Sequence, residues 1–433
     1  MMKCYLLSIT ALLLPALLFS QHLTVLQHVS IVDGTGRPVQ INTNMVIDKD
    51  RIRSIGKPIP TDATAIDMTG KFIMPLLING HGHLGILKDT ATAAANYTSE
   101  NVRHQLARYL DYGVGEILSM GTEQPLGLAI RDSSRRGLIY GATMYSALYG
   151  FGVKNGFPPE GAGFNHVFRP ETAAEAIGDV DKLAPLKPDV IKMWVQGPNI
   201  MKEDIYAAII KEAHQKGIRV ACHVYNLADA EKLVADGVDI IAHSIRDAEI
   251  SDAFVAEIKK RHIIYIPTLS LDEAAFIYED DPDWLNDPFF KAALEPGVYE
   301  MITSPAYKER LRKNPNTAKE KEALRIALKN LYKLYKAGVL IALGTDSGAQ
   351  PLRVQGFSEH LELELMVAAG LTPLEAIRVG TLNGAVLLTI ADRTGSLEAG
   401  KQASFIVLGK DPSMDIRNTR TIESIWVKGK QVK

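Results

Sequence analysis

Hydrophobic and polar positions follow two different patterns along the chain. From Leu23 to Ile73, Val- and Ile-rich segments alternate apolar and polar residues, and turn residues such as Asp33-Gly34 separate them. This alternation is typical of short β-strands. The segment 395–433 repeats the pattern, so both ends of the chain are predicted to be rich in strands. We expect residues 21–73 and 395–433 to form one small composite β-sandwich domain.

The long middle segment, residues 74–394, alternates short apolar runs with helical stretches. Eight runs are candidates for buried parallel strands, at residues 73–83, 113–121, 138–148, 189–195, 218–224, 238–244, 263–269 and 338–346. Eight successive β–α units predict an α/β fold, a (β/α)8 TIM barrel, with functional residues at the carboxyl ends of its strands. A doubly wound sheet is the alternative, but no glycine-rich phosphate loop follows an early strand.

One segment, residues 270–330, is much longer than the usual connection between a strand and a helix. An acidic and aromatic stretch at 273–290 precedes a basic helical stretch at 308–338. A solvated helix face is the simple interpretation of the basic stretch. The alternative hypothesis is that part of the insertion folds over the mouth of the barrel as a lid.

Residues 1–20 have the three-part pattern of a secretory signal peptide. Lys3 supplies a positive charge, residues 5–19 form an uninterrupted run of apolar or small residues, and Ser20 precedes the polar Gln21. The run is short for a membrane-spanning helix, although an uncleaved N-terminal anchor stays open as an alternative. We therefore expect an exported protein, periplasmic or secreted, with no stable membrane insertion after cleavage.

The composition narrows the class of partner. The chain has 433 residues, 46% of them hydrophobic, with 48 Lys and Arg against 50 Asp and Glu. This balance leaves no overall basic field to attract nucleic acid, and the partner expected is a small-molecule substrate. The two cysteines, Cys4 and Cys222, are too few for a disulfide-stapled scaffold. The sequence leaves the oligomeric state open, a homo-oligomer included.

Several side chains that can bind metals stand at or just past the ends of the predicted strands. They are His81, His83, Lys192, His223, His243 and Asp346. In an extended His-Gly-His segment the two imidazoles point the same way, so both can bind one ion. Further imidazoles and a carboxylate suit divalent metals of borderline softness, with Zn²⁺ as the default. One such histidine alone is usually a packing residue, but this many at the same barrel end indicate a metal site.

Lys192 interrupts an otherwise apolar strand, where an unpaired ammonium is costly to bury. A buried lysine loses its proton easily, and the neutral amine can add CO2 to form a carbamate with two oxygens that bridge two metals. We expect this carbamate on Lys192. The alternative is a lysine that pairs with a buried acid such as Asp346.

The motifs INGHGH, DVIKMW, ACHVYN, IAHS and LGTDSG and the segment 362–412 occur here in one order. In this the chain resembles the amidohydrolase superfamily, in its imidazolonepropionase-like and Xaa-Pro dipeptidase-like branch of metal-dependent hydrolases. The resemblance implies a barrel with a composite sandwich and two divalent ions. It implies the following ligands: His81, His83 and Asp346 on the more buried ion, His223 and His243 on the more exposed ion, and carbamylated Lys192 between them. The usual acidic residue two positions before the first metal histidine is Asn79 here.

The reaction expected is hydrolysis of an amide C–N bond in a dipeptide, an N-acyl compound or a cyclic amide. Two divalent ions lower the pKa of a water and make hydroxide available near neutral pH, while Asp346 is the catalytic proton carrier. Tyr225 and Arg353 are candidates for substrate binding. The alternative for Tyr225 is a tyrosine that only packs at the barrel rim, and the alternative for Arg353 is a salt bridge at the rim.

Three other functions stay open at this point. A deaminase of the same superfamily usually carries a Glu near the strand-5 histidine, whereas His223 is followed here by Val-Tyr-Asn. A lactone or phosphotriester hydrolase uses the same pair of metals. An exported metal-binding protein without turnover is the least favoured, because the whole set of residues that activates water is present.

Overall fold

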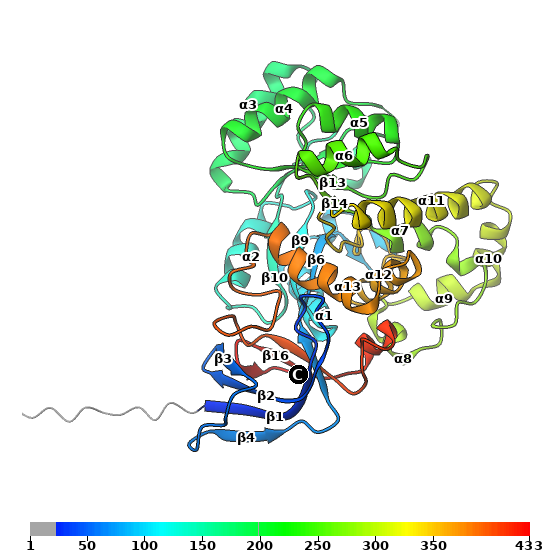
Figure 1. The fold of residues 1–433 in the computed structure, drawn as a ribbon. Coiled ribbons are helices and arrows are strands. Elements are labelled where there is room, and N and C mark those ends of the chain that lie inside the picture. The colour runs from blue at the N-terminus through cyan, green and yellow to red at the C-terminus, as the bar shows by residue number, and fades with distance from the viewer. Residues whose placement is uncertain (1–22, 198) are drawn as a thin grey trace, which may run out of the picture.

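The computed structural model describes residues 23–197 and 199–433. The expected signal peptide, residues 1–20, lies outside the described residues, and so does Cys4. Among the described residues, no helix combines the length and apolar character needed to cross a membrane. A strand-rich part built from both ends of the chain lies below a larger part of mixed strands and helices (Figure 1).

The strand-rich part is one eight-stranded sheet, named here the terminal sheet, in the order β17-β16-β15-β5-β1-β2-β3 with β4 beside β1. Its strands are β1 Leu23–Ile31, β2 Gln40–Asp48, β3 Arg51–Ile55, β4 Thr64–Asp67, β5 Phe72–Pro75, β15 Phe405–Leu408, β16 Ile422–Val427 and β17 Lys430–Gln431. The two ends of the chain meet where β5 pairs antiparallel with β15. The stacked rings of Phe405 and Trp426 belong to its buried apolar cluster. Both strand-rich ends thus share one sheet, while the sandwich arrangement stays a prediction.

The larger part contains parallel strands in the order that the apolar runs predict. They are β6 Leu77–Gly82, β9 Val114–Ser119, β10 Thr143–Ser146, β11 Ile191–Trp194, β12 Val220–His223, β13 Ile240–Ala242 and β14 Ile264–Ile266. Single parallel bridges join Phe151 to Met193 and Tyr265 to Ile341, and a third joins Gly82 to Ser347. The eighth apolar run therefore lies between β14 and β6, and the pairings return to the strand where they began.

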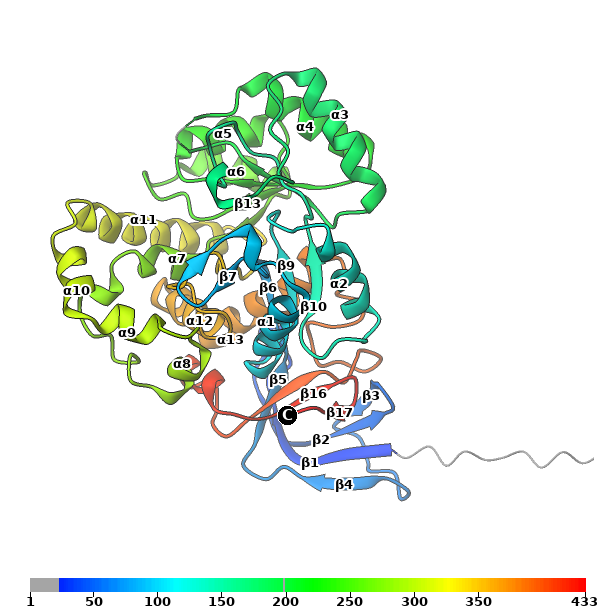
Figure 2. The same cartoon turned by 180° about the vertical axis from the view of Figure 1, so that it is seen from behind.

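Helices follow most of these strands (Figure 2), and several of them bury apolar side chains on one face. They are α1 Ser99–Asp111, α2 Leu126–Arg135, α3 Ala173–Leu183, α4 Glu203–Gln215, α5 Leu227–Ala235, α6 Asp252–Lys260, α12 Phe357–Ala368, α13 Pro373–Arg378 and α14 Gly384–Leu387. Local sequence sets several of their starts: the hydroxyls of Thr98, Ser251 and Thr372 accept hydrogen bonds from backbone N–H groups in the first turns of α1, α6 and α13. Short 3₁₀ turns cover 94–96, 160–162, 184–186, 277–279 and 416–420, a π-helical turn covers 379–383, and Leu87–Lys88 (β7) pairs with Ala91–Thr92 (β8).

The insertion is helical and belongs to the packed interior. It contains α7 Leu269–Ala274, α8 Pro288–Ala293, α9 Val298–Thr303, α10 Pro305–Arg312 and α11 Thr317–Lys336. The Trp284 ring lies 4.8 Å from that of Phe290 and 4.9 Å from that of Phe357 on α12, centroid to centroid. One face of α11 is buried at Leu324, among others, so the basic helix is more than a solvated surface. The lid hypothesis stays a prediction.

Candidate metal centre and active site

The residues predicted to bind metal meet at the carboxyl ends of the strands. His81 lies in β6 with His83 just past it, Lys192 lies in β11, and His223 ends β12. His243 follows β13, and Asp346 follows the eighth apolar run. The ring centroids of His81 and His243 are 4.4 Å apart, and those of His223 and His243 are also 4.4 Å apart. The His81 and His83 rings are 5.9 Å apart. The fold therefore gathers side chains that are far apart in the sequence.

Asp346 lies at the centre of this group. Its Oδ1 is 2.9 Å from His83 Nε2 and 3.3 Å from His81 Nε2, and its Oδ2 pairs with the Arg353 guanidinium. Burial favours the protonated carboxyl, but the Arg353 charge and the two histidine contacts outweigh it and hold the pKa of Asp346 well below its usual range. Asp346 is therefore ionised near neutral pH and can accept a proton or bind a cation.

Lys192 is fully buried beside this carboxylate. Among the described residues its Nζ has no hydrogen-bond partner, and it lies 5.4 Å from the centre of the Trp194 ring. Burial lowers the pKa of Lys192 to about 8, although the Asp346 charge opposes that change. A neutral amine is therefore accessible near neutral pH, as carbamate formation requires.

Three of the candidate ligands, His81, His223 and His243, are held in their neutral form. Burial, helped by the Lys192 charge, lowers the pKa of His81 to about 3. Burial also holds the pKa values of His223 and His243 well below the usual range. A neutral imidazole keeps a lone pair for a metal ion, so these side chains are prepared for binding rather than for carrying charge.

The donors fit a divalent metal ion. One ligand atom from each of His81, His243 and Asp346 lies within 4.8 Å of the other two. Among the described residues both ring nitrogens of His81 are buried without a hydrogen bond, an expensive state that a metal ion relieves. This grouping places His243 with His81 and Asp346, whereas the resemblance assigns His243 to the other ion.

Two threonines orient the imidazoles from behind. Thr122 Oγ1 lies 2.9 Å from His83 Nδ1, and Thr268 Oγ1 lies 2.9 Å from His243 Nδ1. Each contact occupies one ring nitrogen and leaves Nε2 facing the site. Such contacts set the tautomer and the direction of a metal ligand.

A buried network centred on Glu359 of α12 supports β6 from below and was not expected from the sequence. The Glu359 carboxylate accepts hydrogen bonds from Asn79 Nδ2 at 2.6 Å, from the Thr345 and Ser347 hydroxyls at 2.7 Å each, and from the Gly356 N–H at 2.7 Å. Asn79 Oδ1 accepts in turn from the His81 backbone N–H at 2.9 Å. The network therefore ties the strand that carries His81 to the strand end that carries Asp346. In the sequence, the one residue that pointed to this network was Asn79, which stands where the family usually has an acidic residue.

A cavity of about 410 Å³ opens next to the metal-binding side chains. One side is apolar and aromatic, with Phe157, Phe164 and Trp194. The lining also carries Arg246 and Arg353 together with Asp346. The cavity has the size and mixed lining of a site for a small molecule.

The two substrate-binding candidates lie differently from each other. Arg353 lines the cavity but is already paired with Asp346. Tyr225 is not among the residues that line the cavity in the described part of the chain. Its ring supports Arg246 instead, with the guanidinium carbon 4.3 Å from the ring centre.

Arg246 was missed by the sequence reasoning. It is buried, lines the cavity, and its Nε lies 2.9 Å from Asp272 Oδ1 at the start of the insertion. The only sequence signal is its place three residues after His243.

Comparison with known proteins agrees with this arrangement. The Amidohydrolase family model matches residues 72–432. A 5-methylthioadenosine/S-adenosylhomocysteine deaminase of Thermoanaerobacter pseudethanolicus is 24% identical over 390 residues, which are 87% of this chain and 82% of that one. An imidazolonepropionase of Phocaeicola vulgatus is 43% identical over 82 residues, 18% of this chain and 19% of that one.

Solved structures share the fold. A Xaa-Pro dipeptidase with bound methionine in its active site matches with a TM-score of 0.75 and 20% identity, over 95% of this chain and 100% of the other. The A. niger ochratoxinase matches with a TM-score of 0.72 and 22% identity, over 95% and 96% of the two chains. The expected TIM-barrel class, with its α/β content, agrees with these matches.

Proposed function

The chain belongs to the amidohydrolase family, a family of metal-binding hydrolases acting on C–N bonds, and we propose that it hydrolyses the amide bond of a small N-acyl amino acid or dipeptide. The observation that carries this proposal is the cavity in which Arg246 and an apolar wall flank the buried His, Lys and Asp cluster. A carboxylate on the substrate suits Arg246, which lines the cavity although its Nε also pairs with Asp272. An apolar acyl group or side chain suits Phe157 and Trp194.

The metal-binding set proposed is the full group of six side chains. His81, His83, His223, His243, Asp346 and carbamylated Lys192 would hold two divalent ions, with zinc the expected metal. When bound, such ions acidify water and polarise a carbonyl group. Asp346, ionised beside Arg353, accepts the proton of the attacking water and returns it to the leaving nitrogen. Arg246 and the apolar wall hold the substrate and exclude bulk water.

Deamination is the second candidate, because one relative, which is similar over 87% of this chain, is a deaminase. Hydrolytic deamination also needs a proton carrier near the metal. The described residues that line the cavity include no glutamate, and His223 is followed by Val224 and Tyr225. Amide hydrolysis is therefore preferred.

Export is part of the proposal and rests on the sequence of residues 1–20 alone. Expression of the full chain in a bacterium with a periplasm tests it. We expect the mature protein in the periplasm or medium, with its first residue at Gln21. A protein that keeps Met1 or Met2 and stays with the cells contradicts it.

The experiment that tests the reaction is a substrate panel on metal-loaded protein. It contains Xaa-Pro dipeptides, N-acyl amino acids, cyclic amides, lactones, a phosphotriester and 5-methylthioadenosine. We expect release of a free amino acid, with the largest kcat/KM for substrates that carry a carboxylate. Arg246→Met should raise KM for these substrates and leave their uncharged amides unchanged. Release of ammonia from 5-methylthioadenosine as the fastest reaction would establish the deaminase instead.

A further inference from the structure

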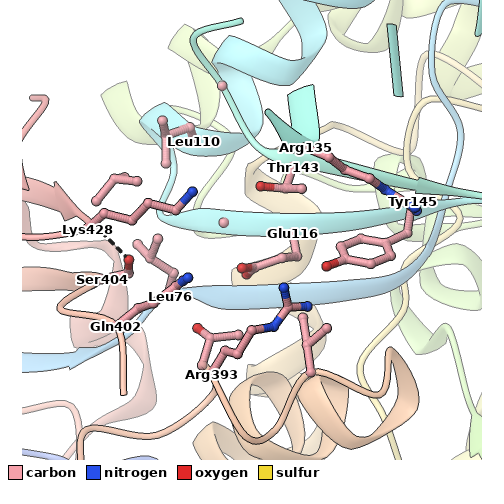
Figure 3. A pocket seen from close by; sticks show the side chains of 15 residues that line it. Leu76, Leu110, Glu116, Arg135, Thr143, Tyr145, Arg393, Gln402, Ser404 and Lys428 are labelled. Carbon is pink, nitrogen blue, oxygen red and sulfur yellow. Dashed lines mark hydrogen bonds between the residues drawn. The ribbon is translucent and has the colours of Figure 1, made fainter. Parts of the chain in front are cut away.

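A second cavity, of about 230 Å³, lies at the opposite end of the barrel strands, where the terminal sheet meets the barrel (Figure 3). Its lining comes from segments far apart in the sequence, among them Glu116 on β9, Tyr145 on β10, Arg393 after α14 and Lys428 after β16. The candidate metal ligands lie at the carboxyl ends of other barrel strands, β6, β11, β12 and β13, and after the eighth apolar run. The catalytic chemistry therefore does not use this cavity.

Glu116 is the central feature of the cavity. Its Oε2 is buried and has no hydrogen-bond partner among residues 23–197 and 199–433. Burial raises the pKa of Glu116 to about 7, while the charges of Arg393 and Lys428 oppose that change. Burial and the nearby Glu116 also raise the pKa of Tyr145 to about 12. A buried carboxylate oxygen without a partner indicates a missing hydrogen-bond donor.

The cations around Glu116 are not equivalent. Arg135 is already neutralised by an ion pair with Asp189, and its guanidinium lies over the Tyr145 ring. Arg393 and Lys428 are exposed, and both line the cavity. Arg393 Nε also lies 3.9 Å from Asp392 Oδ1, an exposed contact that contributes little. In Figure 3 the polar ends of Glu116, Tyr145 and Arg393 point into the same region. The cavity therefore offers one acceptor inside and two available cations towards the solvent.

The rest of the lining is mixed. Leu76, Leu110, Ile390 and Val427 are apolar, and four polar side chains complete it: Thr143, Thr394, Gln402 and Ser404. The volume corresponds to roughly seven or eight water molecules, at about 30 Å³ each, which is too small for most cofactors. A simple anion would leave the Glu116 carboxylate without a donor and would be repelled by it. A simple cation would face Arg393 and Lys428. A small zwitterion with an apolar group matches the Glu116 carboxylate, the two exposed cations and the apolar part of the lining.

We propose that this cavity binds a free aliphatic α-amino acid. The ammonium group donates to Glu116, the carboxylate accepts from Arg393 and Lys428, and the side chain packs against Leu76 and Ile390. The amino acid so bound joins the barrel to the terminal sheet, because Glu116 belongs to the first and Lys428 to the second. The site is separate from the catalytic cavity and does not depend on the substrate of the enzyme.

Titration calorimetry of the full metal-loaded protein with L-leucine tests the proposal. Two analogues each lack one charge: 4-methylpentanoate has no ammonium, and isoamylamine has no carboxylate. Inorganic phosphate tests the cations alone. We expect leucine to bind at least about 10-fold more tightly than either analogue, because each loses a charged hydrogen bond. No leucine binding below 10 mM, or phosphate binding that is equal in wild type and Glu116→Gln, would overturn the proposal.

Variants separate this cavity from the catalytic one. Glu116→Gln and Lys428→Met should each weaken leucine binding at least about 10-fold. Lys430→Met is the matched control, since Lys430 is an exposed lysine two residues further on and does not line the cavity. It should bind leucine as the wild type does, with unchanged circular dichroism in all three variants. Equal leucine binding in all variants would place the amino acid in the catalytic cavity alone and would refute the second site.

Discussion

The two ends of the barrel strands are built from different kinds of side chains. The carboxyl ends carry neutral imidazoles, an ionised aspartate and a buried lysine around one cavity. The amino ends are covered by the terminal sheet, and a side chain on Gly113 there would collide with Ile406 of β15. Buried polar atoms without a hydrogen-bond partner lie at both ends, Lys192 Nζ at one and Glu116 Oε2 at the other. Among the described residues, the donors of a metal site gather at the carboxyl ends. The difference teaches that cavity and burial do not by themselves identify the reacting end; the chemical type of the donors does.

The largest expected effect concerns Lys192. Lys192→Ala should lower kcat/KM by more than about 100-fold and remove metal. Even mutation of a residue that only hydrogen-bonds to a metal ligand costs about 10–100-fold in metal affinity or activity, and Lys192 is itself an expected ligand. Acetate or propionate should partly restore metal content and activity by filling the position of the carbamate. Lys192→Arg should not, since guanidinium stays protonated and cannot take up CO2.

Metal analysis and kinetics with added carboxylate measure both responses. If Lys192 is only a cation that pairs with Asp346, the order reverses: arginine is tolerated better than alanine, and carboxylates do nothing. Growth with bicarbonate and metal should raise the activity of the wild type alone.

The next effect compares matched threonines at the two ends. Thr268→Val removes the hydroxyl beside His243 Nδ1 and should weaken metal affinity by roughly 10–100-fold. Thr143→Val, in the lining of the second cavity, should leave metal affinity unchanged. Competition with a chelator measures both. Equal losses in the two variants would mean that the change acts through general packing.

The third effect is on stability and belongs to the amino ends. Burial raises the pKa of Glu116 from 4.5 to about 7, although the charges of Arg393 and Lys428 act to lower it. Tyr145 also faces Glu116, and its own pKa is raised by burial and by that carboxylate. Folding therefore favours the protonated form, whose stabilisation is fully present below pH 4.5 and is lost as the pH rises through 7. Relative to Glu116→Gln, the wild type should lose on the order of 2 kcal/mol of unfolding free energy between pH 4 and pH 8.

Urea denaturation of both proteins at several pH values measures this difference. Activity per metal-loaded site should agree within about twofold, because Glu116 lies away from the catalytic cavity. Parallel stability curves for the two proteins would show that Glu116 does not titrate as described.

The smallest effect tests whether the insertion reaches the substrate. Lys319 Nζ on α11 lies 5.9 Å from the centre of the Tyr225 ring, next to Arg246. Lys319→Met should raise KM by roughly 2- to 5-fold with little change in kcat, as loss of an exposed cation–π contact implies. Lys336→Met, at the other end of the same helix, should change neither constant. A fall in kcat alone would argue against the lid hypothesis.

Much of the architecture was accessible from the sequence because it depends on local patterns. Eight apolar runs gave the strand order, and His81-Gly-His83 at a strand end is a local signal of metal binding. Contacts between distant segments could not be predicted in this way. The hydrogen bond from Asn79 to Glu359 joins residues with no shared motif, and so does the ion pair of Arg246 with Asp272.

The insertion is a second example of a contact between distant segments that local sequence patterns do not predict. In the sequence, residues 273–290 are recognisable only as an acidic and aromatic stretch. In the structure the ring of Trp284 packs against that of Phe357, a residue of α12. Only the completed fold supplies that partner. The second cavity is a stronger case, because Glu116, Arg393 and Lys428 meet only where the barrel and the terminal sheet close together.

The pairing of β5 with β15 also sets an order of events during synthesis. Ile73 pairs with Val407, so this edge of β5 stays unpaired while the ribosome synthesises the whole barrel. At about 5–20 residues per second, that wait lasts on the order of 20 to 60 s. Throughout it the ribosome-bound chain presents an unpaired apolar strand edge, the usual starting point for aggregation. Chains released without their last thirty or so residues should therefore be lost to aggregation and proteolysis even though every metal-binding residue is present.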